Sequence, residues 1–136
     1  MSLIAWNDRL SVGIASIDKE HQKLVALLNE FYDAVQTGKG KESLARVLAA
    51  LIDYTKKHFA NEEQIFAKTG YPEAAAHKKA HDDLTRQVIE IQQKYTQGAN
   101  ATLPTETLNF LKSWLLTHIQ GTDKKYSSHF VRNGIV

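Results

Sequence analysis

Cysteine is absent from this chain of 136 residues. Its absence excludes disulfide bonds, zinc fingers and thiolate-bound clusters, so any bound metal ion would need nitrogen and oxygen ligands. Long hydrophobic runs are absent too, because the longest uninterrupted apolar run, residues 47–52, is far too short to span a bilayer. The first residues lack the basic start and apolar stretch of a signal peptide. We therefore expect a cytoplasmic protein without a membrane span.

The chain also has little excess charge of either sign. Its 17 basic and 15 acidic residues give a net charge of +2, and the lysines occur in scattered pairs. Nucleic-acid binding would require a basic stripe with a reading motif, and the sequence has neither, so we expect no nucleic-acid partner. Hydrophobic residues make up 43% of the chain, which is enough for the core of one ordinary domain. We expect residues 1–136 to form that single domain.

The spacing of the apolar residues predicts an all-α protein. Helices are expected at about residues 18–37, 41–68, 73–97 and 104–120, with Asp18 as the N-cap of the first. Residues 1–17 are expected to form an extended arm anchored by a buried Trp6, residues 99–103 a loop, and residues 121–136 a short C-terminal tail. Since the connections are short, the helices should be antiparallel neighbours. The prediction for residues 18–120 is an up-down-up-down four-helix bundle.

Five of the six histidines and two carboxylates form a candidate metal site. They occur in four clusters near helix ends, and an antiparallel bundle brings all four clusters to the same end. Within two of the clusters, residues four apart share a helix face. Buried imidazoles at this density are costly unless they are paired or bound to metal. The predicted ligands of a two-metal site are His21, His58, Glu62, His77, His81, His118 and Asp123.

His118 and Asp123 lie five residues apart, which is poor spacing for a regular helix. We therefore predict a π-type bulge or an opened turn between them, made easier by Gly121. His77 and His81 share a helix face, so they should share a metal ion.

Counting coordination positions leaves one of them open. The histidines, two bridging carboxylates and a bridging oxide or hydroxide would fill all but one position on two octahedral ions, and the open one falls on the ion with fewer histidines. This donor set suits iron, manganese or zinc. Iron is favoured because two iron ions together can give two electrons to a small ligand. Apolar neighbours of the ligands, which are also core candidates, would make a dry pocket for a small apolar gas: Leu24, Val25, Phe59, Trp114, Leu115 and Ile119.

These motifs resemble the hemerythrin family, specifically its single-domain bacterial members. The resemblance rests on the arm W-N-D-R-L-S-V-G, the segment H-F-A-N-E-E, the pair H-K-K-A-H and the stretch W-L-L-T-H-I-Q-G-T-D. It implies a non-haem di-iron protein that binds dioxygen reversibly, as a hydroperoxide at the open iron, for oxygen transport or storage. It further implies that His77, His81 and His118 bind one iron, that His21 and His58 bind the other, and that Glu62 and Asp123 bridge both.

Two other functions could use the same site. One is an oxygen or iron sensor that acts through a separate partner. The other is an enzyme, namely a di-iron oxidase, peroxidase or nitric-oxide reductase. Catalytic ferritin-like sites use E-x-x-H motifs and more carboxylates, and no E-x-x-H occurs here, so we expect oxygen binding without activation and no enzyme activity. The expected partners are dioxygen and an unidentified oxygen-using recipient protein, and the expected state is a monomer.

Three further polar residues lie close to the clusters in sequence. Glu20 could orient a ligand, but we expect it to face solvent in the first helical turn. Tyr126 could donate a hydrogen bond to a ligand or simply pack in the tail. His129 falls outside the pattern and is expected on the surface.

Overall fold

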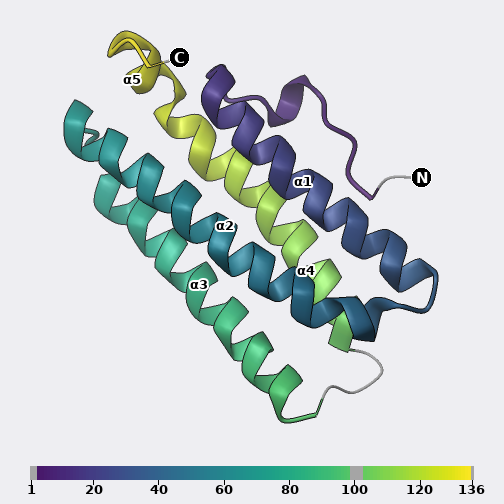
Figure 1. Cartoon of the computed structure of the whole chain (residues 1–136). Helices are drawn as coiled ribbons and strands as arrows, with labels where there is room; N and C mark the ends of the chain where they lie inside the picture. The colour runs from purple at the N-terminus through teal and green to yellow at the C-terminus, as the bar shows by residue number, and fades with distance from the viewer. Residues whose placement is uncertain (1–2, 99–102, 136) are drawn as a thin grey trace.

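The computed structural model describes residues 3–98 and 103–135, and four long helices run side by side within them (Figure 1). They are α1 (Ala15–Gln36), α2 (Gly40–Thr69), α3 (Ala74–Thr96) and α4 (Leu103–Thr117). Successive helices run in opposite directions, with α2 packed against α1 and α3, and α4 packed against α1 and α2. The predicted all-α, up-down-up-down bundle is confirmed. Residues 99–102 of the predicted loop lie outside the described residues.

Helix α1 begins earlier than its sequence suggests. Its N-cap is Ile14, so the prediction that Asp18 caps this helix is wrong. The Asp18 carboxylate instead accepts hydrogen bonds from the Ser11 hydroxyl at 2.5 Å and from the Val12 backbone N–H at 2.9 Å. The arm offers this side chain two donors, and the N–H of Asp18 already donates to the Ile14 carbonyl within α1. Asp18 therefore fastens the arm to the bundle.

The arm is anchored by aliphatic side chains rather than by its tryptophan. Trp6 is only partly buried, so its predicted burial is wrong. Ile4, Leu10 and Ile14 are buried instead. The Asn29 side chain also pairs with both the backbone N–H and the carbonyl of Ile4, each at 2.9 Å. A short 3-10 turn, η1 (Asp8–Leu10), interrupts the extended path.

The chain changes its helical form after α4. A π-helical turn, η2 (His118–Thr122), is followed by a 3-10 turn, η3 (Asp123–Tyr126), and a short helix, α5 (Ser127–Arg132). The Asp123 N–H donates to the His118 carbonyl, which is the i to i+5 bond of a π-helix. The predicted π-type turn is therefore confirmed. Gly121 does not lie at positive φ, so the backbone here does not require a glycine.

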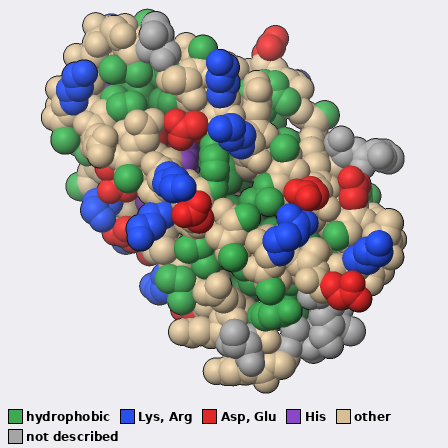
Figure 2. Space-filling model, in the orientation of Figure 1, with side chains coloured by type: hydrophobic (Ala, Val, Ile, Leu, Met, Phe, Trp, Pro, Cys, Tyr) green, Lys and Arg blue, Asp and Glu red, His purple; other side chains and the backbone are tan. Residues whose placement is uncertain are grey.

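One end of the bundle core is apolar and the other carries the candidate ligands. Phe31, Leu44 and Leu48 are fully buried at the apolar end. Among the described helices, none has the length and apolar composition needed to cross a bilayer. Figure 2 shows basic and acidic side chains interspersed over one face, with hydrophobic side chains between them. This mixture agrees with the scattered charges of the sequence.

Candidate metal centre

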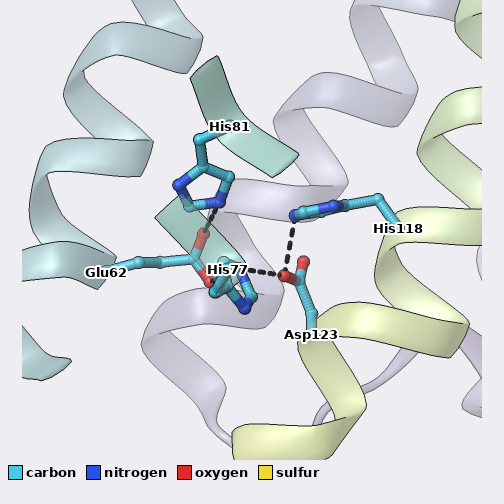
Figure 3. A group of neighbouring side chains, drawn as sticks. All are labelled: Glu62, His77, His81, His118 and Asp123. Atoms are coloured by element: carbon cyan, nitrogen blue, oxygen red, sulfur yellow. Dashed lines mark ion pairs between the residues drawn. The ribbon is translucent and has the colours of Figure 1, made fainter. Parts of the chain in front are cut away.

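All seven predicted ligands lie together at one end of the bundle, and none is more than 5% exposed. This is the end at which α1 begins, α2 ends, α3 begins and α4 passes into η2. The ligands come from α1, α2 and α3, together with η2, which holds His118, and η3, which holds Asp123. Figure 3 shows five of the side chains pointing toward one another from α2, α3 and the segment that follows α4. The four sequence clusters therefore lie at the same end of the bundle, as expected.

The seven residues divide into two groups that share both carboxylates. The first group contains His77, His81 and His118 together with Glu62 and Asp123. The second contains His21 and His58 with the same Glu62 and Asp123. Within each group, the candidate ligand atoms all lie within 4.8 Å of one another. One group therefore has three histidines and the other has two.

The distances between nitrogens and oxygens suit ligands around common centres. Asp123 Oδ1 lies 3.0 Å from His77 Nε2 and 2.9 Å from His118 Nε2, and its Oδ2 lies 3.0 Å from His21 Nε2. Glu62 Oε1 lies 3.2 Å from His58 Nε2 and 3.3 Å from His81 Nε2. Two ligands at right angles on one ion, each at about 2.1 Å, would be separated by about 3 Å. The two carboxylates therefore lie between the two sets of imidazoles.

Most of these atoms also lack hydrogen bonds. The Nε2 atoms of four histidines and all four carboxylate oxygens are buried without a partner of suitable geometry; the residues are His21, His77, His81, His118, Glu62 and Asp123. Leaving a buried polar atom unsatisfied costs about 1–3 kcal/mol, more for a charged group. So many orphaned donor atoms converging on one space are expected of metal ligands. The residues therefore fit a pair of metal ions.

The carboxylates are held in their charged form. Burial raises the pKa of Asp123, but its contacts with His118, His21 and His77 outweigh burial and hold the pKa well below its usual value. Burial and the charge of Asp123 raise the pKa of Glu62, whereas contacts with His58 and His81 lower it, with a net result of about 2. Two buried anions side by side form a strongly cation-attracting centre.

Carboxylates also contact the outer nitrogens of two histidines. His58 Nδ1 donates to Glu20 Oε2 at 2.6 Å, so the expectation that Glu20 faces solvent is wrong. His81 Nδ1 donates to Glu63 Oε2 at 3.1 Å. Glu63 was missed from the sequence, although it directly follows Glu62 in the H-F-A-N-E-E segment. Burial lowers the pKa of His58, but its contacts with Glu20 and Glu62 outweigh burial and raise it to about 10.

Tyr126 packs beneath the site. Its ring is fully buried and stacks on Phe130 at 4.2 Å between centroids, which confirms tail packing. The hydroxyl has no hydrogen bond of suitable geometry. Its pKa is raised well above the usual value, chiefly by burial and then by the charges of Asp123 and Glu62.

His129, expected on the surface, is instead partly buried. Its Nε2 lies 3.1 Å from the Thr69 carbonyl oxygen, and its ring packs near Tyr71. This contact ties helix α5 to the end of α2.

A small apolar cavity of about 10 Å³ lies in the bundle core, and no candidate ligand is among its lining residues. Three of the six expected pocket residues line it: Leu24, Trp114 and Leu115. The other lining residues are Leu28, Leu51, Thr55, Leu84 and Leu111. Several lie three positions from a candidate ligand along the helix, which places the cavity about one helical turn deeper in the bundle.

The remaining three expected pocket residues are buried but do not line this cavity. Phe59 stacks flat on His81, with 3.7 Å between the ring centroids and 2° between the planes. Val25 and Ile119 belong to the surrounding core.

The family model for the hemerythrin HHE cation binding domain matches residues 12–129. Among curated proteins, the bacteriohemerythrin of Stenotrophomonas maltophilia is 35% identical over 127 residues, covering 93% of this chain and 81% of that protein. The bacteriohemerythrin of Methylococcus capsulatus is 34% identical, covering 93% and 95%. A wild-type hemerythrin crystal structure superposes with a TM-score of 0.83 at 32% identity, covering 93% and 97%. The chain therefore belongs to the hemerythrin family.

Proposed function

We propose that this chain binds two iron ions through the seven clustered residues and binds dioxygen reversibly, for oxygen transport or storage. The observation that carries the proposal is a pair of ligand groups that share two carboxylates, with an apolar cavity about one helical turn deeper in the bundle. The relatives named bacteriohemerythrin support it. In this proposal residues 1–136 work as one hemerythrin-like domain.

The donor set favours iron. All seven donors are imidazoles or carboxylates, which suits iron, manganese or zinc, while structural zinc sites are usually tetrahedral. The five-residue group exceeds that number of ligands. When bound, two ferrous ions would supply the two electrons that one dioxygen molecule takes up and later returns. A bridging oxide or hydroxide would complete the site.

The protein side chains divide the remaining work. His77, His81 and His118 would hold one ion, His21 and His58 the other, and Glu62 and Asp123 both. The second group has fewer protein donors, so it has room for dioxygen. Leu24 and Leu115 line the cavity and would exclude water, which slows the loss of oxygen as superoxide.

The same reasoning favours a binding protein over an enzyme. The site contains two carboxylates and five imidazoles, and fewer anionic donors stabilise high-valent iron less. We further propose a cytoplasmic monomer that passes dioxygen to an oxygen-using recipient protein.

Cycling between anaerobic and aerobic buffer tests the proposal. The iron-loaded protein is reduced without air, exposed to oxygen, purged and followed by its visible spectrum over several cycles, with Glu62→Ala as the control. A coloured adduct that forms and disappears reversibly in the wild type alone is expected. Irreversible conversion to the diferric form, or steady oxygen consumption with reductant, would instead favour the enzyme.

A further inference from the structure

Two polar residues of the H-F-A-N-E-E segment and one acidic residue of α1 surround the candidate ligands without joining them. Asn61 and Glu63 lie on α2, on either side of the shared Glu62. Glu20 lies on α1, immediately before His21. Asn61 hydrogen bonds to Glu20, which hydrogen bonds to His58. Glu63 hydrogen bonds separately to His81.

Glu20 is held from several directions by α2. Its Oε2 accepts from His58 Nδ1 at 2.6 Å, and its Oε1 accepts from Asn61 Nδ2 at 3.0 Å. The hydroxyl of Tyr54 donates to the Glu20 backbone carbonyl. The Glu20 side chain is 26% exposed, whereas His58 is 1% exposed. The carboxylate thus lies between solvent and a buried imidazole, with both of its oxygens engaged.

Glu63 makes the equivalent contact on the other side of the site. Its Oε2 lies 3.1 Å from His81 Nδ1, and its side chain is 31% exposed. Phe59 covers the face of the same imidazole. The plane of His81 is therefore set by an aromatic ring, and its Nδ1 proton points to a carboxylate.

Not every candidate histidine ligand has such a contact. His21 Nδ1 is buried and has no hydrogen-bond partner. Glu20 thus contacts His58 of the two-histidine group, and Glu63 contacts His81 of the three-histidine group. A histidine that donates Nδ1–H to a carboxylate keeps its lone pair on Nε2, holds its ring orientation and becomes a stronger donor.

We propose that Glu20 and Glu63 are positioning residues, each acting on a different metal ion. Glu20, steadied by Asn61, presents His58 Nε2 to the ion of the two-histidine group. Glu63 presents His81 Nε2 to the ion of the three-histidine group. The proposal rests on the metal site proposed above, but it does not depend on iron or on oxygen binding.

Zinc binding to the metal-free protein tests this directly. Zinc is diamagnetic, so the ring 15N signals of individual histidines can be followed as free zinc rises. The variants are Glu20→Gln, Asn61→Ala and Glu63→Gln. Glu30→Gln is the matched control, because Glu30 is 57% exposed and pairs only with the surface residue Arg46 among the contacts described. Thermal melting checks that each variant is folded.

The expected result is that each variant weakens zinc binding by one group of histidines and not by the other. Glu20→Gln should raise the free zinc concentration needed to shift the His21 and His58 signals by about 10–100-fold, the usual effect of losing such a contact. The zinc concentration that shifts the signals of the three-histidine group should not change. Glu63→Gln should do the reverse. Asn61→Ala should act in the same direction as Glu20→Gln but more weakly, and it tests the same contact if Glu20→Gln does not fold.

Two results would overturn the proposal. The first is zinc titrations of Glu20→Gln and Glu63→Gln that match Glu30→Gln, which would leave the metal site intact and remove the positioning role. The second is equal weakening of zinc binding by both groups of histidines in each variant, which would indicate general destabilisation. Failure of wild-type protein to bind zinc through the histidines would overturn the metal site itself.

Discussion

Replacing Leu115 with alanine tests whether the apolar cavity protects the site. Leu115 is 3% exposed, lies on α4 and lines the cavity. The change removes three buried carbon groups, worth roughly 0.8 kcal/mol each, and enlarges an existing void. With the added cavity term, the free energy of unfolding should fall by about 3 kcal/mol, within the usual range for such changes. The wider cavity should also admit water and speed autoxidation.

Leu108→Ala is the matched control. Leu108 lies on the same helix, is 4% exposed and is not among the residues that line the cavity. Urea unfolding of the metal-free proteins should show similar losses of stability for both variants. Spectra of the oxygenated, iron-loaded proteins should show faster autoxidation for Leu115→Ala alone. Equal autoxidation rates in the two variants, or a rate below wild type for Leu115→Ala, would refute the lining role.

Three further substitutions and one change of pH address the ligands and the arm. Glu62→Ala removes a residue shared by both groups, so metal analysis should find loss of bound iron; two retained irons with full oxygen binding would contradict the assignment. In the metal-free protein the pKa of His58 is raised to about 10, so at about pH 7.5 its ring is protonated and must release that proton to bind metal. Calorimetry in buffers of different ionisation enthalpy should show fewer protons released on zinc binding by His58→Gln, and equal release would contradict this. The same raised pKa stabilises the metal-free fold fully below about pH 6.5, and this contribution should be lost as pH rises toward 10. Asp18→Ala removes two hydrogen bonds to the arm and should lower the opening free energy of the Val12 amide by about 1–3 kcal/mol in hydrogen exchange; unchanged exchange would show that the aliphatic anchors hold the arm alone.

The start of α1 shows where local sequence rules fail. Asp18 has the residue type and position of an N-cap, yet its carboxylate bonds to the arm and the helix begins at Ala15. Similarly, Trp6 is the largest apolar residue of the arm but is only partly buried. In both cases the way the arm packs on the bundle, outside any regular helix, decided the outcome. Such packing leaves no periodic signal in the chain.

The sequence alone determined the helices, their antiparallel order and the convergence of the seven candidate ligands. Helical rise and rotation per residue are constant, so the spacing of His77 and His81 sets a shared face. The five-residue step from His118 to Asp123 indicates a π-type bulge or an opened turn, and the structure has the π-turn. These are relations within one helix, or between helix ends joined by short connections, and spacing is enough to derive them.

Only the tertiary structure decided the contacts between helices. The pairing of Glu20 with His58, and of Glu63 with His81, depends on how α1, α2 and α3 are rotated about their axes and on the angles at which they cross. The same rotations place Leu24, Trp114 and Leu115 around the cavity while Val25 and Ile119 face other parts of the core. Spacing along the chain identifies the face of a helix, but the packing of all the side chains sets which residue of the next helix that face meets.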